Sequence, residues 1–237
     1  MKRHRLGQHY LVDPRVAESL INAAVIRKDE TVVEIGTGRG VLTGALARAC
    51  ARLDGYEVDR ENYEETLART KESNAFIHLA DAFEQRPEFD VLVSSLPYSR
   101  SLDFVEWISQ VDYSRGAVIL QEDFVRKVLA PPGSRDYRGV SAIAQISSDV
   151  TEVGRVARSA FQPPPRVNSL IVLFRPRVRL TEKEVASIKR LFSLRRREVS
   201  SALRTTRMRE SRPSYGGRRV SSLTPAEVYE ICSERGA

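Results

Sequence analysis

Thr31-Val32-Val33-Glu34-Ile35-Gly36-Thr37-Gly38-Arg39-Gly40 is a short apolar run followed at once by alternating glycines. The run is typical of a buried β-strand, and the glycines let the backbone turn tightly from that strand into a helix. The N–H groups that open such a helix can hold an anion, for example the carboxylate of a nucleoside cofactor. Val41 stands where a dinucleotide-binding loop has its third glycine, so the spacing does not favour NAD.

This strand and loop open a regular alternation that continues to about residue 175. Strand-like runs cover 31–35, 53–58, 75–79, 91–94, 116–121, 151–156 and 169–174, and helical patterns between them include 41–50, 61–69, 102–109 and 122–129. The alternation predicts an α/β fold, with a Rossmann-like sheet of seven mostly parallel strands and helices on both faces. Ligands of such sheets bind at the carboxyl ends of the strands.

The pattern becomes helical after Pro176. Thr181 is placed to cap a helix, with Glu184 as its capping-box partner three residues later. We therefore predict a large α/β domain over residues 1–178 and a small helical domain over 179–237.

The charge of the chain is concentrated in that second part. Residues 175–219 hold 15 Lys and Arg against 4 Asp and Glu, a local net charge of +11, which leaves −4 for the rest of a chain with net charge +7. Arg clusters pair with backbone phosphates, so the segment favours a nucleic-acid-binding surface. A solvated, Arg-rich helical surface without a partner is the alternative.

Composition excludes several other classes of protein. At 237 residues with 41% hydrophobic residues, the chain can bury a full core. It has neither an apolar run long enough to cross a membrane nor the hydrophobic region of a secretion signal. Cys50 and Cys232 are far apart and lack metal-ligand spacing, so we expect no metal site and a reducing, cytoplasmic location.

Two acidic residues strengthen the prediction of a nucleoside cofactor. Glu57 ends the second strand-like run, about 20 residues after the glycine loop, where a carboxylate can accept hydrogen bonds from ribose hydroxyls. Asp81 follows the third run and is placed to accept from the amine of the cofactor's adenine. For either acid alone, a solvated loop carboxylate is the favoured interpretation. Three sites at the ends of three successive strands indicate one cofactor site.

Ser95-Leu96-Pro97-Tyr98 follows the fourth run, and alone it is a common turn. In this position its parts suit a planar amine. The Ser95 hydroxyl and the Leu96 carbonyl can accept hydrogen bonds from the amine, Pro97 fixes the turn, and Tyr98 offers a ring for stacking. Together with the glycine loop, this stretch indicates transfer of a methyl group from S-adenosylmethionine to a base nitrogen.

These motifs resemble the ribosomal RNA adenine dimethyltransferase family of the KsgA type, and the resemblance runs nearly end to end. Its most specific stretch is Phe161 to Ser169, Phe-Gln-Pro-Pro-Pro-Arg-Val-Asn-Ser. The short length and the Gln8-His9 pair favour archaeal members. Besides the motifs above, the resemblance rests on residues 7–13, 120–122, 137–141 and 192–197.

The resemblance implies dimethylation of adjacent adenosines near the end of small-subunit ribosomal RNA, during ribosome biogenesis, by a monomer. It implies S-adenosylmethionine contacts at Gln8, His9, Leu11, Gly36, Gly38, Glu57, Asp81 and Ser95. The implied catalytic residues are Ser95, Leu96, Pro97 and Tyr98, with Phe161 as a second stacking face, although Phe161 is equally an ordinary core aromatic. The implied RNA-binding residues are Arg195, Arg196 and Arg197.

The chain departs from the family pattern at Ser95, where the family usually has Asn, and at the following residues 99–101. Serine is shorter, and a lost or lengthened hydrogen bond costs about 1–3 kcal/mol. The extent of methylation therefore stays open, as do two alternatives: a ribosome-assembly factor with weakened or no catalysis, and a methyltransferase of a different ribosomal RNA site.

Overall fold

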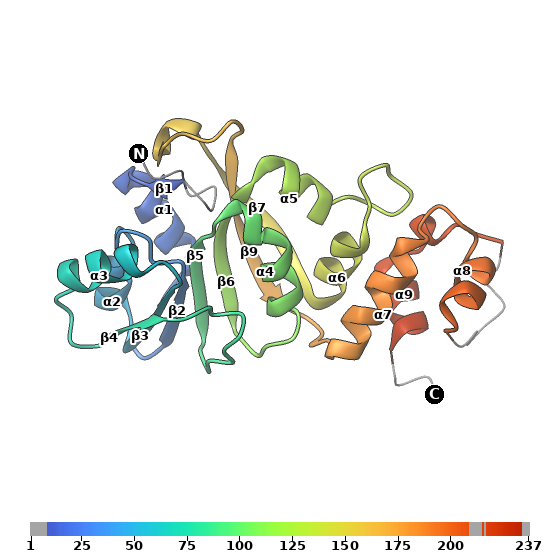
Figure 1. Cartoon of the computed structure of the whole chain (residues 1–237), viewed down its shortest axis with the longest axis horizontal. Coiled ribbons are helices and arrows are strands. Elements are labelled where there is room, and N and C mark those ends of the chain that lie inside the picture. The colour runs from blue at the N-terminus through green and yellow to red at the C-terminus, as the bar shows by residue number, and fades with distance from the viewer. Residues whose placement is uncertain (1–8, 209–214, 216, 234–237) are drawn as a thin grey trace.

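The computed structural model describes residues 9–208, 215 and 217–233. At its centre lies a seven-stranded sheet in the order β4-β3-β2-β5-β6-β9-β7 (Figure 1). The strands are β2 (Thr31–Ile35), β3 (Arg52–Glu57), β4 (Ala75–Leu79), β5 (Val91–Ser95), β6 (Arg115–Gln121), β7 (Ser148–Val156) and β9 (Ser169–Pro176). The strands from β4 to β6 in this order run parallel to one another, and β9 runs antiparallel to its neighbours β6 and β7. The predicted mostly parallel α/β sheet is confirmed.

Strand β7 begins earlier than the sequence predicts, at Ser148 in place of residue 151. The residues before 151 have no strong apolar pattern, but they pair with the far end of β9, where Ser148 lies opposite Pro176. A register shift between Glu152 and Gly154 accommodates the long pairing. This strand start depends on a partner strand and not on local sequence.

Helices cover both faces of the sheet because neighbouring residues of each inner strand are apolar. Val32 belongs to the hydrophobic cluster with α1 (Pro14–Ala24) and α2 (Thr43–Ala49). Val33 belongs to the cluster on the opposite face, with helices α4 (Ser101–Ile108), α5 (Glu122–Val128) and α6 (Gly139–Ser147). Successive side chains of a strand point to opposite faces, so a strand buried on both sides reads as a continuous apolar run. Helix α3 (Arg60–Arg69) follows β3.

The C-terminal helices are α7 (Glu182–Ser193), α8 (Val199–Thr206) and α9 (Pro225–Cys232). The predicted capping box opens α7: the Glu184 N–H donates to Thr181 Oγ1 at 3.2 Å, and the Thr181 N–H donates to Glu184 Oε2 at 2.7 Å. Buried residues of α7 and α9 belong to the same hydrophobic cluster as α4 and α6. The predicted boundary at 178/179 falls in the connection between β9 and α7.

A second, two-stranded sheet joins distant parts of the chain. Strand β1 (Tyr10–Leu11) pairs antiparallel with β8 (Phe161–Gln162), so that Leu11 lies opposite Phe161. The Val12 N–H donates to the Ala160 carbonyl at 2.8 Å and continues the pairing. The segment before α1 is therefore held against the segment before β9.

The junction of β2 and β5 brings the two principal motifs together. The register pairs Val32 with Val91 and Glu34 with Val93 in parallel, so both strands end at the same edge of the sheet. The buried Ser94 hydroxyl donates to the Ile35 carbonyl at 2.6 Å. Gly36, with φ of +74°, follows directly, and a Cβ at this position would lie 3.4 Å from Pro97 Cδ. The glycine loop and the Ser95–Tyr98 turn are thus in contact.

None of the described helices is long and apolar enough to cross a membrane. Within residues 9–208, 215 and 217–233, no group of three or more His, Cys, Asp and Glu is arranged as metal ligands. Cys50 and Cys232 are buried free thiols.

Replacing Ser94 by alanine should lower the free energy of unfolding by about 1–3 kcal/mol, because the Ile35 carbonyl loses a buried hydrogen bond. Urea denaturation measures the change. The exposed Ser99→Ala variant is the control and should leave stability near that of the wild type. Equal stability of the two variants would contradict a structural role for the Ser94 hydroxyl.

Candidate active site

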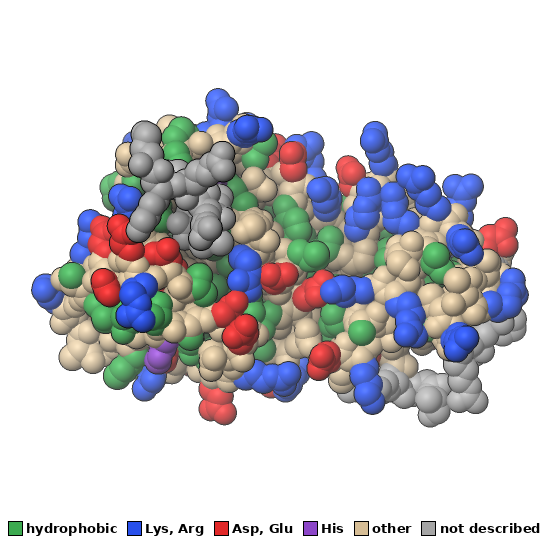
Figure 2. All heavy atoms as spheres, viewed as in Figure 1, with side chains coloured by type: hydrophobic (Ala, Val, Ile, Leu, Met, Phe, Trp, Pro, Cys, Tyr) green, Lys and Arg blue, Asp and Glu red, His purple; other side chains and the backbone are tan. Residues whose placement is uncertain are grey.

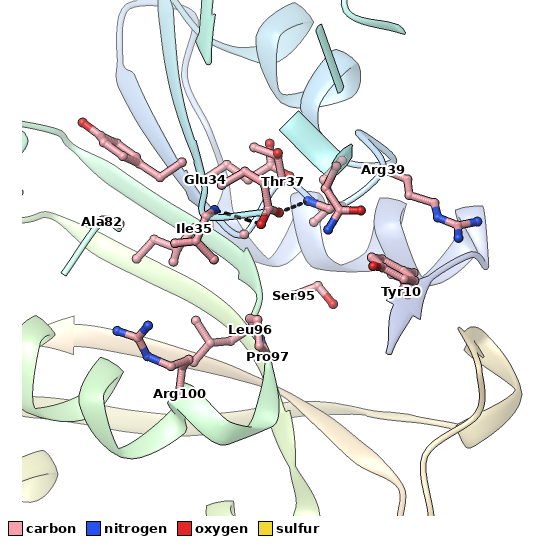
Figure 3. Close-up of a pocket in the computed structure, with 18 of the residues that line it drawn as sticks. Tyr10, Glu34, Ile35, Thr37, Arg39, Ala82, Ser95, Leu96, Pro97 and Arg100 are labelled. Carbon is pink, nitrogen blue, oxygen red and sulfur yellow. Dashed lines mark hydrogen bonds between the residues drawn. The ribbon is translucent and has the colours of Figure 1, made fainter. Parts of the chain in front are cut away.

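A pocket opens at the carboxyl ends of β2, β3 and β5. Figure 3 shows Tyr10 and Arg39 on one side, Ala82 and Arg100 on the other, and Ser95 between them. The structure brings together nine of the residues predicted for the site, which line this pocket: His9, Leu11, Gly36, Gly38, Glu57, Asp81, Ser95, Leu96 and Pro97. Gln8 lies outside the described residues.

The Glu57 carboxylate is fixed by backbone N–H groups. Its Oε1 accepts from Val58 and Asp59, and its Oε2 accepts from Gly38, each at 2.9 Å. Burial raises the pKa of Glu57, whereas the three N–H donors favour its charged form. Oε2 has only Gly38 as a donor among the described residues, so it can accept further hydrogen bonds from a ligand.

Glu34 is a pocket residue that sequence reasoning did not assign. It is 1% exposed, and its Oε2 accepts from Thr43 Oγ1 at 2.8 Å. No described residue bonds to its Oε1. Burial, together with the nearby Glu57, raises the pKa of Glu34 to about 8. A buried polar atom without a partner at a pocket wall fits a site that receives a polar ligand. Its only signal in the sequence is an acidic residue within an apolar strand.

Asp81 is engaged on both oxygens. Its Oδ1 accepts from the Phe83 N–H at 2.9 Å, and its Oδ2 accepts from Arg100 Nη1 at 2.9 Å. Arg100 is a second pocket residue that sequence reasoning did not assign, and its Nε donates to Asp103 Oδ2 at 2.7 Å. The sequence places Arg100 19 residues after Asp81, and nothing in its pattern indicates the pair.

The predicted turn has two sides. Ser95, Leu96 and Pro97 line the pocket, while the Tyr98 hydroxyl lies 2.6 Å from Ser169 Oγ on β9. Residues Tyr98–Arg100 form a short 3-10 helix, closed by a 2.8 Å bond from the Arg100 N–H to the Pro97 carbonyl. Burial raises the pKa of Tyr98, so its hydroxyl is neutral at physiological pH.

Two further aromatic residues surround Tyr98. The centroid of its ring lies 5.3 Å from that of His9 and 6.3 Å from that of Phe161, which meets it edge-on at 68°. His9 Nδ1 lies 2.7 Å from the Pro163 carbonyl, and a carbonyl only accepts, so Nδ1 carries the hydrogen. Phe161 is 3% exposed within the hydrophobic cluster of α1. The structure brings these rings together but leaves no free face on Phe161.

The predicted RNA-binding residues lie away from the pocket. Arg195, Arg196 and Arg197 follow α7, and Arg196 and Arg197 are exposed. Partial burial and the positive charges of Arg138 and Arg196 lower the pKa of Arg195, so Arg138, which precedes α6, belongs to the same cationic group. Figure 2 shows Lys and Arg side chains gathered over the C-terminal helical part.

The arrangement suits an adenosine-containing cofactor. Glu57 and Asp81 can accept hydrogen bonds from hydroxyl and amine groups, and Glu34 Oε1 adds a buried polar atom that has no partner among the described residues. Ser95, Leu96 and Pro97 line the same pocket, and the Ser95 hydroxyl and the Leu96 carbonyl are groups that can accept hydrogen bonds from a second substrate. Such a pocket can hold a methyl donor against an amine.

Comparison with known proteins gives a consistent result. The model of a family described as "Ribosomal RNA adenine dimethylase" matches residues 1–231. The chain is 33% identical to a Pyrococcus abyssi protein named "Probable ribosomal RNA small subunit methyltransferase A", over 96% of this chain and 89% of that protein. It is 32% identical to the Thermotoga maritima "Ribosomal RNA small subunit methyltransferase A", over 98% of this chain and 84% of that protein.

A solved structure shares the fold over nearly the whole length. The crystal structure of a dimethyladenosine transferase from Plasmodium falciparum superposes with a TM-score of 0.81 at 22% sequence identity. The superposition covers 94% of this chain and 96% of that one. The shared fold therefore extends beyond the seven-stranded sheet into the C-terminal helical part.

Replacing Glu34 by glutamine should weaken the dependence of stability on pH. The folded protein keeps a proton on Glu34 up to about pH 8, whereas the unfolded chain releases it near the ordinary pKa of 4.5. Stability should therefore fall as the pH rises from about 5 to 8. Urea denaturation at both pH values measures this fall, which should be smaller in Glu34→Gln. The exposed Glu64→Gln variant should keep the wild-type fall, and the same fall in all three proteins would contradict the shift.

Proposed function

Because the chain belongs to the ribosomal RNA adenine dimethylase family, we propose that it methylates the exocyclic amines of adenosines in small-subunit ribosomal RNA. The protein is an enzyme, and S-adenosylmethionine is its methyl donor. The observation that carries the proposal is the pocket in which the glycine loop, Glu57, Asp81 and the Ser95–Pro97 turn meet. The names of the similar proteins support the small subunit. The specific targets are adjacent adenosines near the end of that RNA, dimethylated during ribosome biogenesis.

The residues present fit the cofactor. Glu57 Oε2 accepts from the ribose hydroxyls, and Asp81 accepts from the adenine amine. The backbone at Gly36 and Gly38 permits close approach, since both have positive φ and carry no side chain. His9, Leu11 and Ser95 complete the wall of the pocket. A contact by Gln8 stays a prediction.

The chemistry requires an amine with an available lone pair. An adenine amine delocalises that pair into the ring, and acceptors aimed at its two hydrogens draw the nitrogen toward tetrahedral geometry. Ser95 Oγ and the Leu96 carbonyl are these acceptors, and Pro97 holds them in place. S-adenosylmethionine supplies an activated methyl group on a positively charged sulfur. The protein contributes alignment for in-line transfer, and the methylated amine loses its proton without a strong base.

Tyr98 supplies the stacking face for a flipped adenine, with its orientation fixed by the bond to Ser169. Phe161 supports the Tyr98 ring edge-on in the present arrangement. A second stacking face on Phe161 would require a change that uncovers the ring, because only 3% of it is exposed. It stays a prediction.

The C-terminal part, 179–237, supplies the RNA-binding surface. Arg195, Arg196 and Arg197 bind backbone phosphates, which position the RNA without reading its sequence. The protein acts as a monomer on the immature small subunit, in the cytoplasm.

Ser95 supports one alternative, an assembly factor with weakened or no catalysis. The deciding experiment is methyl transfer from labelled S-adenosylmethionine to immature small subunits that lack the modification, with identification of the product nucleoside. We expect dimethyladenosine. If the wild type makes only monomethyladenosine and the Ser95→Asn variant makes dimethyladenosine, Ser95 is what prevents the second methyl transfer. Transfer only to large-subunit RNA would indicate a different site, and no transfer by either protein with cofactor bound would favour the assembly factor.

Replacing Glu57 by alanine should abolish detectable S-adenosylmethionine binding, measured by calorimetry, because the ribose loses its acceptor. Binding to small-subunit RNA should stay near that of the wild type, since Glu57 lies in the pocket and not on the basic surface.

The matched control is a variant that should lose RNA binding and keep cofactor binding. Neutralising Arg195, Arg196 and Arg197 with glutamine should weaken RNA binding and flatten its dependence on salt, while cofactor binding is unchanged. Loss of both cofactor binding and RNA binding in either variant would contradict the proposal that the two sites are separate.

A further inference from the structure

Three groups hold the guanidinium of Arg100 at the pocket. Its Nη1 donates to Asp81 Oδ2 at 2.9 Å and its Nε donates to Asp103 Oδ2 at 2.7 Å. The guanidinium carbon lies 4.7 Å from the centroid of the Phe83 ring, which packs in turn against Trp107. Two carboxylates and an aromatic face therefore fix the plane of the guanidinium before any ligand binds.

This arginine keeps unused donors. Its Nη2 has no hydrogen-bond partner among the described residues, and the side chain lines the pocket together with Asp81 and Ala82. Figure 3 shows it extending past Leu96 toward the side of the pocket where Ala82 lies. An acceptor (Asp81) and a donor (Arg100) thus stand side by side at one end of the pocket.

Adenine presents the complementary pattern. Its N6 amine donates, and the ring nitrogen N7 on the same edge accepts. We propose that Arg100 is a specificity-determining residue that donates a hydrogen bond to N7 of the cofactor's adenine while Asp81 accepts from N6. The proposal rests on the proposed function, since it needs S-adenosylmethionine in this pocket with its adenine toward Asp81.

A purely structural role gives a different expectation. An arginine that only orients Asp81 would support every adenine ligand equally, whether or not N7 is present. An arginine that donates to N7 discriminates against a ligand with C–H in place of N7, because a fixed donor is left unpaired. The discrimination between the two ligands, and not their absolute affinity, therefore tests the proposal.

The experiment measures calorimetric binding of S-adenosylhomocysteine and of its 7-deaza analogue, without RNA or turnover. Wild-type protein should bind the 7-deaza analogue about 10-fold or more weakly. Arg100→Met should bind both ligands with similar affinity. Arg126→Met, which removes an exposed arginine paired with Asp123 on α5, should keep the wild-type discrimination.

Asp103→Asn is a milder second variant, because it removes one anchor of Arg100 at a carboxylate that is 53% exposed. Asp103→Asn should reduce the difference in affinity between S-adenosylhomocysteine and its 7-deaza analogue. It keeps the proposal testable if Arg100→Met does not fold. Equal affinity of wild-type protein for the two ligands overturns the proposal, as does discrimination that survives in Arg100→Met. Failure of the wild type to bind S-adenosylhomocysteine at all would instead overturn the proposed function.

Discussion

The parallel pairing of β2 with β5 is the contact on which the rest of the site depends. It brings the glycine loop that follows one strand against the Ser95–Tyr98 turn that follows the other. The Ser94 hydroxyl bonded to the Ile35 carbonyl ties the two ends together, and Gly36 leaves the space that Pro97 occupies. A donor site and an acceptor site can then share one pocket wall, which in-line transfer requires.

The pocket concentrates buried acidic groups in a basic protein. Glu34 and Glu57 are both nearly inaccessible to solvent, and their mutual repulsion contributes to the raised pKa of Glu34. Backbone N–H groups and Thr43 compensate in part. Such groups cost stability when no ligand is bound, but they need no rearrangement to accept hydrogen bonds from one. The proposed cofactor site is thus preformed at the expense of stability.

The basic surface is held at a fixed place relative to this pocket by a shared core. Tyr137, fully buried before α6, packs edge-to-face against Phe192 near the end of α7, with ring centroids 5.4 Å apart. The charge of Arg138 lowers the pKa of Arg195 although the two residues stand 57 positions apart in the sequence, so they belong to one cationic group. In the proposed function, phosphate contacts at this group position the RNA so that one base reaches the Ser95–Tyr98 turn.

The sequence by itself determined the strands of the sheet, the capping box at Thr181 and nine of the residues that line the pocket, because apolar periodicity, glycine spacing and carboxylates at strand ends are local signals. Tertiary structure alone decided the early start of β7, the unpartnered oxygen of Glu34, the Arg100–Asp81 pair and the burial of Phe161. Each of these depends on which side chains other elements bring near, and on how much water they exclude. A residue's type and spacing do not encode that environment, which forms only when the whole chain packs.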